Sequence, residues 1–194
     1  FIIAQIDISA GMGLNFFSSP DLRDYINSNF ISSEEMGSFN TSADFFGEVG
    51  YNLNSLDEKK YYQIAIEYNY NIFSFNSNFI SGNYDLQLNQ HMPSIIGYYV
   101  IEGLGYKIKF GIGIGVRMAQ ADEKLYGTVE KYSSTGLGFL LKGQGDTKLG
   151  GDLYAVIAGE LKYDLPGEIR TLNGAKFNLN TLGIALKLGI SYHL

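Results

Sequence analysis

The most regular pattern in the chain is the alternation of apolar with small or polar residues from Leu182 to Leu194. One parity holds only apolar side chains, whereas the other holds glycine, alanine, serine, Lys187 and His193. Because successive side chains of a strand point to opposite faces, this segment predicts a strand with one wholly apolar face. Such a strand is typical of a barrel wall with lipid outside and a crowded, hydrated lumen inside.

The same alternation predicts seven further strands. Two are as regular as the last one: Ile6–Phe16 and Tyr106–Met118. Three alternate less cleanly: Phe39–Leu53, Tyr62–Ile72 and Leu153–Leu165. In Tyr84–Ile101, Pro93 interrupts the pattern, and in Tyr126–Leu141 the stretch 133–138 weakens it, so the phase of these two strands stays open.

Short and long connections alternate between these strands. The short ones are 54–60, 103–105 and 143–150, and the long ones are 18–38, 74–83, 119–125 and 166–176. Serial strands with this asymmetry predict an all-β fold: an eight-stranded antiparallel up-and-down transmembrane β-barrel, with residues 1–194 as one domain. In that arrangement the C-terminus and the short turns share the periplasmic side.

Composition supports strands and excludes several functions. The chain has 15 Tyr, 13 Phe and 24 Gly, but only 3 Pro and neither Cys nor Trp. Tyrosine and phenylalanine favour strands, and the lack of Cys excludes thiol chemistry. With 14 basic and 20 acidic residues the net charge is −6, which argues against nucleic-acid binding.

Charged residues on the inward parity predict a polar lumen. The expected acids are Asp7, Asp44, Glu48, Glu67, Asp152, Glu160 and Asp164, and the expected bases are Lys107, Lys109, Arg117, Lys162 and Lys187. Because an eight-stranded barrel is just wide enough for side chains to fill, these charges must pair or be hydrated. We expect a plug in which Glu48 and Glu67 meet Arg117, Lys109 or Lys187, within a network that also includes Glu160 and Lys162. A narrow porin-like channel for ions or small solutes is the alternative. A hydrophobic conduit would need an apolar lumen instead.

Catalytic chemistry has little support in the sequence. His91, Ser94 and Asp85 are the one conceivable constellation, but His91 and Ser94 fall on opposite faces unless Pro93 creates a bulge. We therefore expect His91 to be a hydrogen-bonded lumen histidine and the protein not to be an enzyme. No spacing of residues predicts a metal site or a cofactor site.

The first long connection predicts a short helix. Ser19 is a suitable N-cap and Pro20 a suitable first residue, and Leu22, Tyr25 and Ile26 follow on one face. We expect this helix to pack on the rim of the barrel. Outward tyrosines near the strand ends suit the interfacial girdles of a membrane protein.

Taken together, these patterns resemble the OmpA/OmpX type of eight-stranded outer-membrane barrel over essentially the whole chain. Lys187, Gly189, Tyr192 and Leu194 match the C-terminal assembly signal of that family, with Leu in place of the commoner terminal Phe. The resemblance implies recognition by the barrel assembly machinery and a place in the bacterial outer membrane, in contact with its lipid and lipopolysaccharide. It implies a structural or interaction module of the cell envelope that meets other envelope proteins through its loops. A lipid-modifying outer-membrane enzyme is a distant alternative. Residues 1–4 resemble the remnant of a signal peptide.

Overall fold

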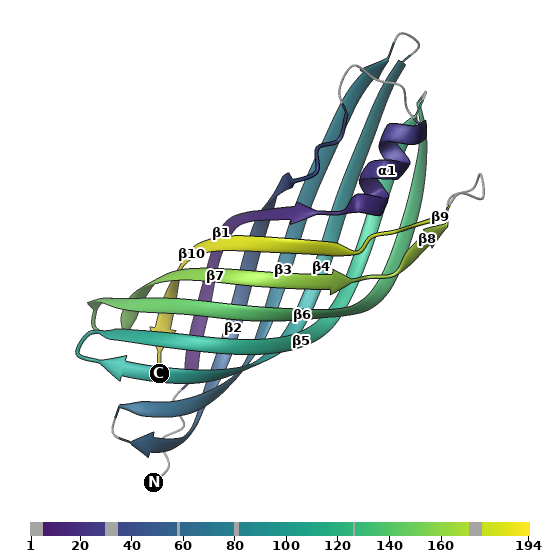
Figure 1. The fold of residues 1–194 in the computed structure, drawn as a ribbon. Coiled ribbons are helices and arrows are strands. Elements are labelled where there is room, and N and C mark those ends of the chain that lie inside the picture. Colours follow the sequence, from purple (N-terminus) through teal and green to yellow (C-terminus); the bar gives the residue numbers. More distant parts are fainter. Residues whose placement is uncertain (1–5, 30–34, 58, 80–81, 126, 171–175) are drawn as a thin grey trace.

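Eight long antiparallel strands close into a barrel in the computed structural model (Figure 1). The structure describes residues 6–29, 35–57, 59–79, 82–125, 127–170 and 176–194. The expected signal-peptide remnant at residues 1–4 lies outside them. The barrel strands are β1 (Ile6–Ser18), β2 (Asn40–Asp57), β3 (Lys60–Phe79), β4 (Gly82–Gly103), β5 (Tyr106–Leu125), β6 (Thr128–Gly150), β7 (Leu153–Leu165) and β10 (Thr181–His193). The remaining elements are α1 (Pro20–Asn29), β8 (Glu168–Arg170) and β9 (Lys176–Asn178).

Sequence neighbours pair around the ring, and β1 pairs with β10 to close it. In that closing ladder Asp7 lies opposite His193, and Ser18 lies opposite Leu182. Within the closed wall every strand is paired on both edges, so this part of the sheet has no unpaired edge. The predicted fold class is therefore confirmed, and β7 has the bounds predicted from the sequence.

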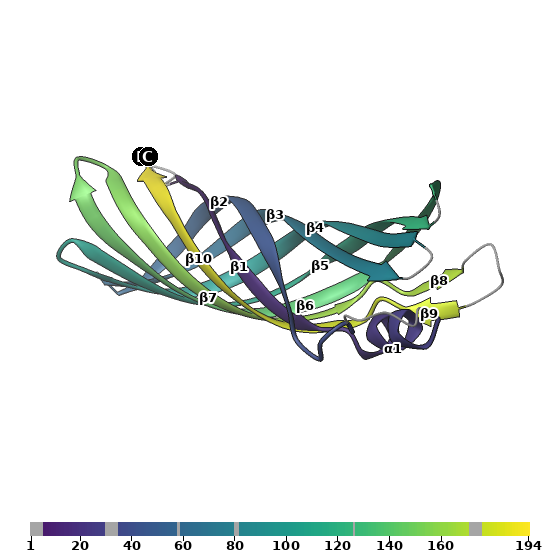
Figure 2. The same cartoon turned by 90° about the horizontal axis from the view of Figure 1, so that it is seen from above.

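The two ends of the barrel differ. Both described chain ends lie at one end, which we call the terminal end, together with the tight turns at Leu104–Gly105 and Gly151–Asp152. Gly105 has a φ of 81°, a conformation that side-chain-bearing residues rarely adopt. The opposite, distal end carries α1 and the β8–β9 hairpin, which lie side by side in both views (Figure 2).

Four strands continue far beyond the rest of the wall at the distal end. The β2–β3 ladder stops at Ala43–Ile72, and the β6–β7 ladder begins only at Leu137–Leu165. Pairing between β3, β4, β5 and β6 continues past these points into a projecting sheet (Figure 1). The long loops expected at 74–83 and 119–125 are therefore wrong, because most of these residues belong to strands.

The two faces of the projecting sheet exchange their polarity relative to the barrel wall. Within the wall, β3 points Ile64 and Ile66 outward and Glu67 inward, whereas above it Phe73 points inward and Ser74 outward. The exchange has a physical reason. The inner surface of the projecting sheet is apolar because it packs against α1 and the β8–β9 hairpin. Its outer surface lies beyond the apolar belt and is polar. A pattern with apolar residues outside and polar residues inside therefore misreads these segments as loops.

An apolar core closes the distal end of the lumen, and we call it the cork. α1 contributes Leu22 and Ile26, which are 1% and 2% exposed. The other buried members are Phe17, Met36, Phe73, Tyr84, Leu86, Leu88, Ala119, Ala121, Ile169, Phe177 and Leu179. The helix begins at Pro20, as the sequence predicts, with the Arg23 amide donating to the carbonyl of Ser19. Its apolar face is thus buried inside the mouth of the barrel.

No helix among the described residues has the length and the apolar character needed to cross a membrane.

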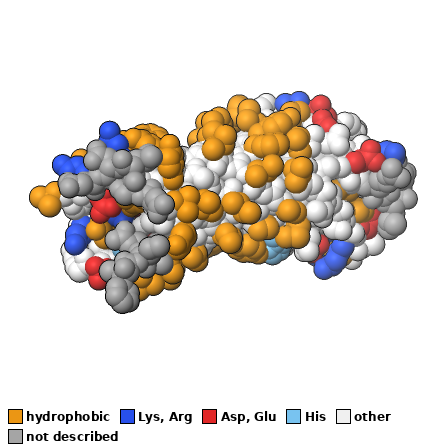
Figure 3. Space-filling view, turned by 90° about the horizontal axis from the view of Figure 1, so that it is seen from below, with side chains coloured by type: hydrophobic (Ala, Val, Ile, Leu, Met, Phe, Trp, Pro, Cys, Tyr) orange, Lys and Arg blue, Asp and Glu red, His pale blue; other side chains and the backbone are white. Residues whose placement is uncertain are grey.

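Exposed apolar side chains form a broad belt on the outer surface. In Figure 3 they cover the middle of the molecule, while Lys, Arg, Asp and Glu gather toward its two ends. On β5 and β10 the belt consists of Ile108, Phe110, Ile112, Ile114, Val116, Leu182, Ile184, Leu186, Leu188 and Ile190. Such a continuous apolar surface would be unfavourable in water and is typical of a wall that faces lipid.

Candidate functional site

The inward faces of the wall strands bring together a buried set of charged side chains, which we call the lumen network. Its acids are Asp7, Asp44, Glu48, Glu67, Asp146, Glu160 and Asp164, and its bases are Lys107, Lys109, Arg117, Lys142, Lys162 and Lys187. All are 5% exposed or less. Isolated charges at this burial would be costly, so the pairing between them decides what the lumen can do.

At the middle of the barrel, Lys142 from β6 is the centre of the network. Its Nζ lies 2.9 Å from a carboxylate oxygen of Glu48 and 3.5 Å from one of Glu160, and it also bonds to Glu67. Tyr98 donates its phenol proton to Glu48 over 2.6 Å. Strands from several sides of the barrel thereby meet across the lumen.

Lys187 from β10 forms the second bridge at this level. Its Nζ lies 2.6 Å from Glu160 and 3.7 Å from Glu67, and it donates to the side-chain oxygen of Asn69. The Phe46 ring lies beneath both lysines, with Nζ-to-centroid distances of 5.3 Å for Lys142 and 5.1 Å for Lys187. The two ammonium groups are thus held by carboxylates and by one aromatic face.

A second group of charges lies toward the terminal end. Lys109 reaches Asp7 over 3.1 Å and Asp146 over 3.4 Å. The His193 ring joins them, with its Nδ1 3.0 Å from a carboxylate oxygen of Asp7. Lys107 Nζ also approaches Nδ1 of this ring, at 2.5 Å. The side chain of His193 therefore points inward at the tip of β10, as predicted.

Toward the distal end the pairs become simpler. Lys162 donates to Asp44 over 2.7 Å. Arg117 binds Asp164 on one side and donates to the Ser94 hydroxyl over 3.0 Å on the other. Above these pairs the inner surface becomes apolar and meets the cork. From the terminal end to the cork, side chains thus cross the lumen at successive levels.

The expected partners are only partly those observed. Glu67 does meet Lys187, but Arg117 binds Asp164 rather than Glu48 or Glu67. Lys109 pairs with Asp7 and Asp146, one level nearer the terminal end. Sequence parity places a side chain inside the barrel, whereas the strand tilt and stagger decide which charges share a level.

Asp152 was expected inside, but it is exposed in the β6–β7 turn. β6 continues to Gly150, so the turn to β7 lies at Gly151–Asp152 and carries Asp152 into solvent. The short connection expected at 143–150 is therefore wrong. The glycines at 143 and 145 suggest a turn, yet Lys142, Gln144 and Asp146 continue the inward parity through them. That alternation is the signal by which Lys142 and Asp146 could have been found.

His91 does not lie in the lumen. It faces outward, where its Nδ1 is 2.5 Å from the Tyr68 hydroxyl and its ring contacts that of Tyr70. Ser94 faces inward to Arg117, and the β3–β4 register passes Pro93 without a shift. The bulge needed to unite His91 with Ser94 is therefore absent among these described residues, and so is the conceivable catalytic pair.

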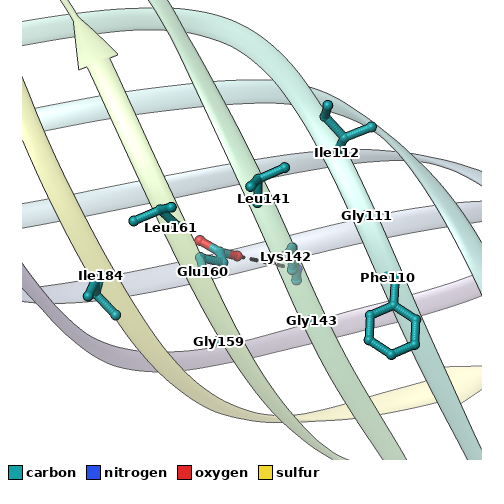
Figure 4. Close-up of a pocket in the computed structure, with 10 residues that line it drawn as sticks. All are labelled: Phe110, Gly111, Ile112, Leu141, Lys142, Gly143, Gly159, Glu160, Leu161 and Ile184. Atoms are coloured by element: carbon teal, nitrogen blue, oxygen red, sulfur yellow. Dashed lines mark ion pairs between the residues drawn. The ribbon is translucent and has the colours of Figure 1, made fainter.

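The wall thins on the outer face where two glycines pair directly. Gly143 of β6 lies opposite Gly159 of β7, and together they floor an apolar groove of about 700 Å³ (Figure 4). Phe110, Ile112, Leu141, Leu161 and Ile184 line its sides. The Lys142–Glu160 ion pair lies directly behind this wall, on the lumen side.

The residues expected to form an assembly signal divide between the two faces. Lys187 lies in the lumen network, whereas Tyr192 and Leu194 are exposed on the outside. Gly189 leaves room for neighbours, since an added Cβ would lie 2.4 Å from the carbonyl oxygen of Ala10. Among the described residues no group of three or more His, Asp or Glu side chains could hold a metal ion.

Comparison with known proteins finds similar structures. No family model matches the chain, and no curated protein matches it. The crystal structure of neisserial surface protein A (NspA) is similar, with a TM-score of 0.58 and 14% identity over 96% of each chain. Ail, the attachment invasion locus protein of Yersinia pestis, gives a TM-score of 0.57 and 13% identity over 98% of this chain and 99% of that one.

A major outer membrane protein from Thermus thermophilus is equally similar. Its TM-score is 0.58, with 12% identity over 97% of this chain and 99% of that one. At such low identity these likenesses bear on the fold alone. The chain has the fold of the small eight-stranded outer-membrane β-barrels, as its alternation pattern predicts.

Proposed function

We propose that this protein is an integral outer-membrane barrel that serves as a structural and interaction module of the bacterial envelope, with a lumen plugged by its own side chains. The observation that supports a plugged lumen is the order of its side-chain contacts along the barrel axis. Paired charges span it at successive levels, and the apolar cork closes it above Arg117. The apolar belt and the fold support the membrane location.

The projecting sheet of β3 to β6 supports an interaction role. Its outer face is polar and its inner face is held by the cork, so it presents a rigid surface rather than flexible loops. The terminal end then faces the periplasm and the projecting sheet faces outward, where it meets lipopolysaccharide and other envelope proteins. Binding surfaces carried on a rigid scaffold are common in proteins.

Conductance in a planar lipid bilayer tests the plug. The refolded protein, whose folding is first verified by its heat-dependent gel shift, should form a silent barrel because no continuous hydrated path crosses the paired levels. Steady openings whose ion selectivity changes in Glu48→Gln or Arg117→Gln would establish the alternative, a narrow channel with a charged filter. Glu48 and Arg117 lie at different levels, so the pair of variants also locates such a filter.

The C-terminal residues Lys187, Gly189, Tyr192 and Leu194 belong to the same proposal as the assembly signal. Tyr192→Ala should slow insertion into vesicles that contain the barrel assembly machinery more than it slows unassisted folding, and more than Tyr163→Ala slows the same insertion. Tyr163→Ala is the matched control, because both tyrosines face outward with 49% and 47% exposure for Tyr163 and Tyr192. Equal slowing of the two variants would remove the signal from the proposal.

A further inference from the structure

The imidazole ring of His193, at the tip of β10, has two competing neighbours at one nitrogen atom. Its Nδ1 lies 2.5 Å from the ammonium nitrogen of Lys107 on β5 and 3.0 Å from Oδ1 of Asp7 on β1. An ammonium group can only donate a hydrogen bond, and an ionised carboxylate can only accept one. Nδ1 therefore satisfies one neighbour at a time: it accepts from Lys107 without a proton and donates to Asp7 with one.

The carboxylate of Asp7 has one oxygen atom available for such a donor. Its Oδ2 accepts from Gln63 over 2.7 Å and from Lys109 over 3.1 Å. Oδ1 has no hydrogen-bond donor among the described residues, although Asp7 is only 2% exposed. Lys107 approaches Oδ1 only to 3.8 Å, which is too far for a hydrogen bond. Because a buried acceptor without a donor is unfavourable, a proton on Nδ1 would meet a partner already in place.

The two contacts of Nδ1 connect different parts of the wall. Asp7 and His193 are directly opposite in the ladder that closes the barrel, so their contact lies along the β1–β10 seam. Lys107 comes from β5, which lies opposite β1 in the order of strands around the ring. The contact between Lys107 and His193 therefore crosses the mouth of the lumen at the terminal end.

The surroundings of the ring leave its other nitrogen in one state and keep it in reach of water. The hydroxyl of Ser191 lies 3.2 Å from Nε2 and can accept its proton whether the ring is neutral or charged. Tyr154 of β7 packs on the ring, with 4.1 Å between the ring centroids. The His193 side chain is 11% exposed. The other titratable groups around this cluster are Tyr61, Glu102, Lys109, Asp146, Lys148 and Asp152.

We propose that His193 is a proton-dependent latch at the terminal mouth of the lumen. The neutral ring accepts from Lys107 and connects β10 to β5 across the mouth. The protonated ring donates to Asp7, strengthens the closing seam and repels the Lys107 ammonium group, which moves toward Glu102, 3.8 Å away. Histidine is the side chain that ordinarily changes charge between about pH 5 and 8, so mild acid operates the latch.

The latch acts on the mouth and leaves the plug in place. Its release admits water to the level of Gln144, whose side-chain oxygen is buried without a donor among the described residues. The ion pairs around Lys142 lie deeper and do not involve His193. The latch requires only that the terminal end meets water, so it does not depend on whether the lumen conducts.

Nitrogen NMR of the full chain in detergent micelles tests the latch, with histidine rings and lysine ammonium groups ¹⁵N-labelled. His91→Gln and Lys107→Met assign the signals. At about pH 8 the His193 ring should carry its proton on Nε2, and at about pH 5.5 on both nitrogens, while most carboxylates stay ionised. The Lys107 signal should shift with the same midpoint, and this shift should vanish in His193→Gln. A proton on Nδ1 of the neutral ring, or a Lys107 signal that ignores His193, would overturn the proposal.

The change in urea midpoint from about pH 8 to about pH 5.5 gives a second test. Lys107→Met should gain stability on acidification relative to the wild type, because the protonated ring no longer meets an ammonium group. Asp7→Asn should lose stability relative to the wild type, because the protonated ring loses its acceptor. If Asp7→Asn does not refold, the lysine variant and its control decide the matter.

Lys148→Met is the matched control for Lys107→Met. The two ammonium groups lie 5.9 Å and 5.8 Å from the centroid of the Tyr154 ring, but it is Lys107 that contacts Nδ1 of His193. Lys148→Met should therefore respond to pH like the wild type. Equal responses of the two lysine variants would contradict the latch.

Opening of the mouth can be measured with a single thiol, since the chain has no Cys. Gln144→Cys places this thiol at a position that is 3% exposed in the wild type. Its rate of reaction with a small neutral methanethiosulfonate is compared between the wild-type and His193→Gln backgrounds, so that the ratio cancels the pH dependence of the thiol itself. This ratio should rise roughly three- to tenfold from about pH 8 to about pH 5.5. A constant ratio would show that protonation of His193 does not open the mouth.

Discussion

At the scale of single residues, Lys142 shows how the lumen depends on pairing. Its ammonium group neutralises carboxylates from three strands: Glu48, Glu67 and Glu160. Lys142→Met keeps much of the side-chain volume but leaves these acids with less compensation. Breaking a buried ion pair by removing one partner costs about 3–5 kcal/mol. Urea unfolding of the refolded barrel should show a loss of that order.

Lys131→Met is the control for this loss. Lys131 also forms an ion pair, with Asp122, but its side chain is 74% exposed on the outer face. Exposed pairs contribute about 0–1 kcal/mol. If both lysine variants lost the same free energy of unfolding, the ion pairs of the lumen network would contribute no more to stability than an exposed ion pair.

Glycines provide a second residue-scale test. An added Cβ at Gly11 would lie 2.1 Å from the carbonyl oxygen of Leu188, a backbone atom of β10 that cannot move without opening the closing ladder. Gly11→Ala should therefore destabilise the barrel by about 1–3 kcal/mol, the usual range for overpacking. Gly143→Ala meets nothing within 4 Å and should be neutral or slightly stabilising. The urea midpoints of the two variants should move in different directions or by clearly different amounts.

At the scale of elements, the sequence predicts strands well where the environment on each face matches the pattern assumed. The sequence predicts the bounds of β7 to the residue, because one face of this strand is apolar on the outer surface and the other faces the lumen along its whole length. In β3 the alternation continues through Phe73, Ser74 and Phe75, but with the faces exchanged. What lies against each face of the projecting sheet is a tertiary property, so local alternation cannot reveal it.

α1 is the element whose role can be tested without disturbing the wall. Ile26→Asp places a charge in the cork, where Ile26 is 2% exposed, and should release the helix while the ladders hold the barrel closed. Arg23 lies in α1 and is the only Lys or Arg before Lys59, so tryptic cleavage at Arg23 reports the release. The variant should be cleaved at least about tenfold faster, with its heat-dependent gel shift retained.

Ser28→Asp is the control, because Ser28 lies on the exposed face of the same helix. It adds the same charge and should leave the cleavage rate near that of the wild type. Unchanged cleavage in Ile26→Asp would mean that α1 is held by contacts other than the apolar core.

At the scale of the whole molecule, the composition of the lumen was largely predictable and its connections were not. Parity placed Glu48, Glu67, Lys109, Arg117 and Lys187 inside. Their partners depend on the stagger of strands around a closed ring, which no segment of the sequence contains. Lys142 is missed for a different reason: the glycines at 143 and 145 suggest a turn, although the inward alternation of Lys142, Gln144 and Asp146 continues through them.

The position of the apolar belt along the barrel axis predicts where an outward-facing charge lowers stability and where it does not. Ile112 is 68% exposed in the belt, so an arginine there would meet lipid hydrocarbon if the barrel spans a bilayer. Arginine near the bilayer midplane costs about 2–4 kcal/mol in such barrels, and the cost falls toward the interfaces. Ile112→Arg should therefore lower the free energy of unfolding from lipid vesicles by that amount. Ser74→Arg, on the outer face of the projecting sheet, should change it little because the side chain stays in water. Equal effects at the two positions would mean that the apolar belt does not mark the depth at which the barrel sits, and the proposed membrane location would lose its main physical support.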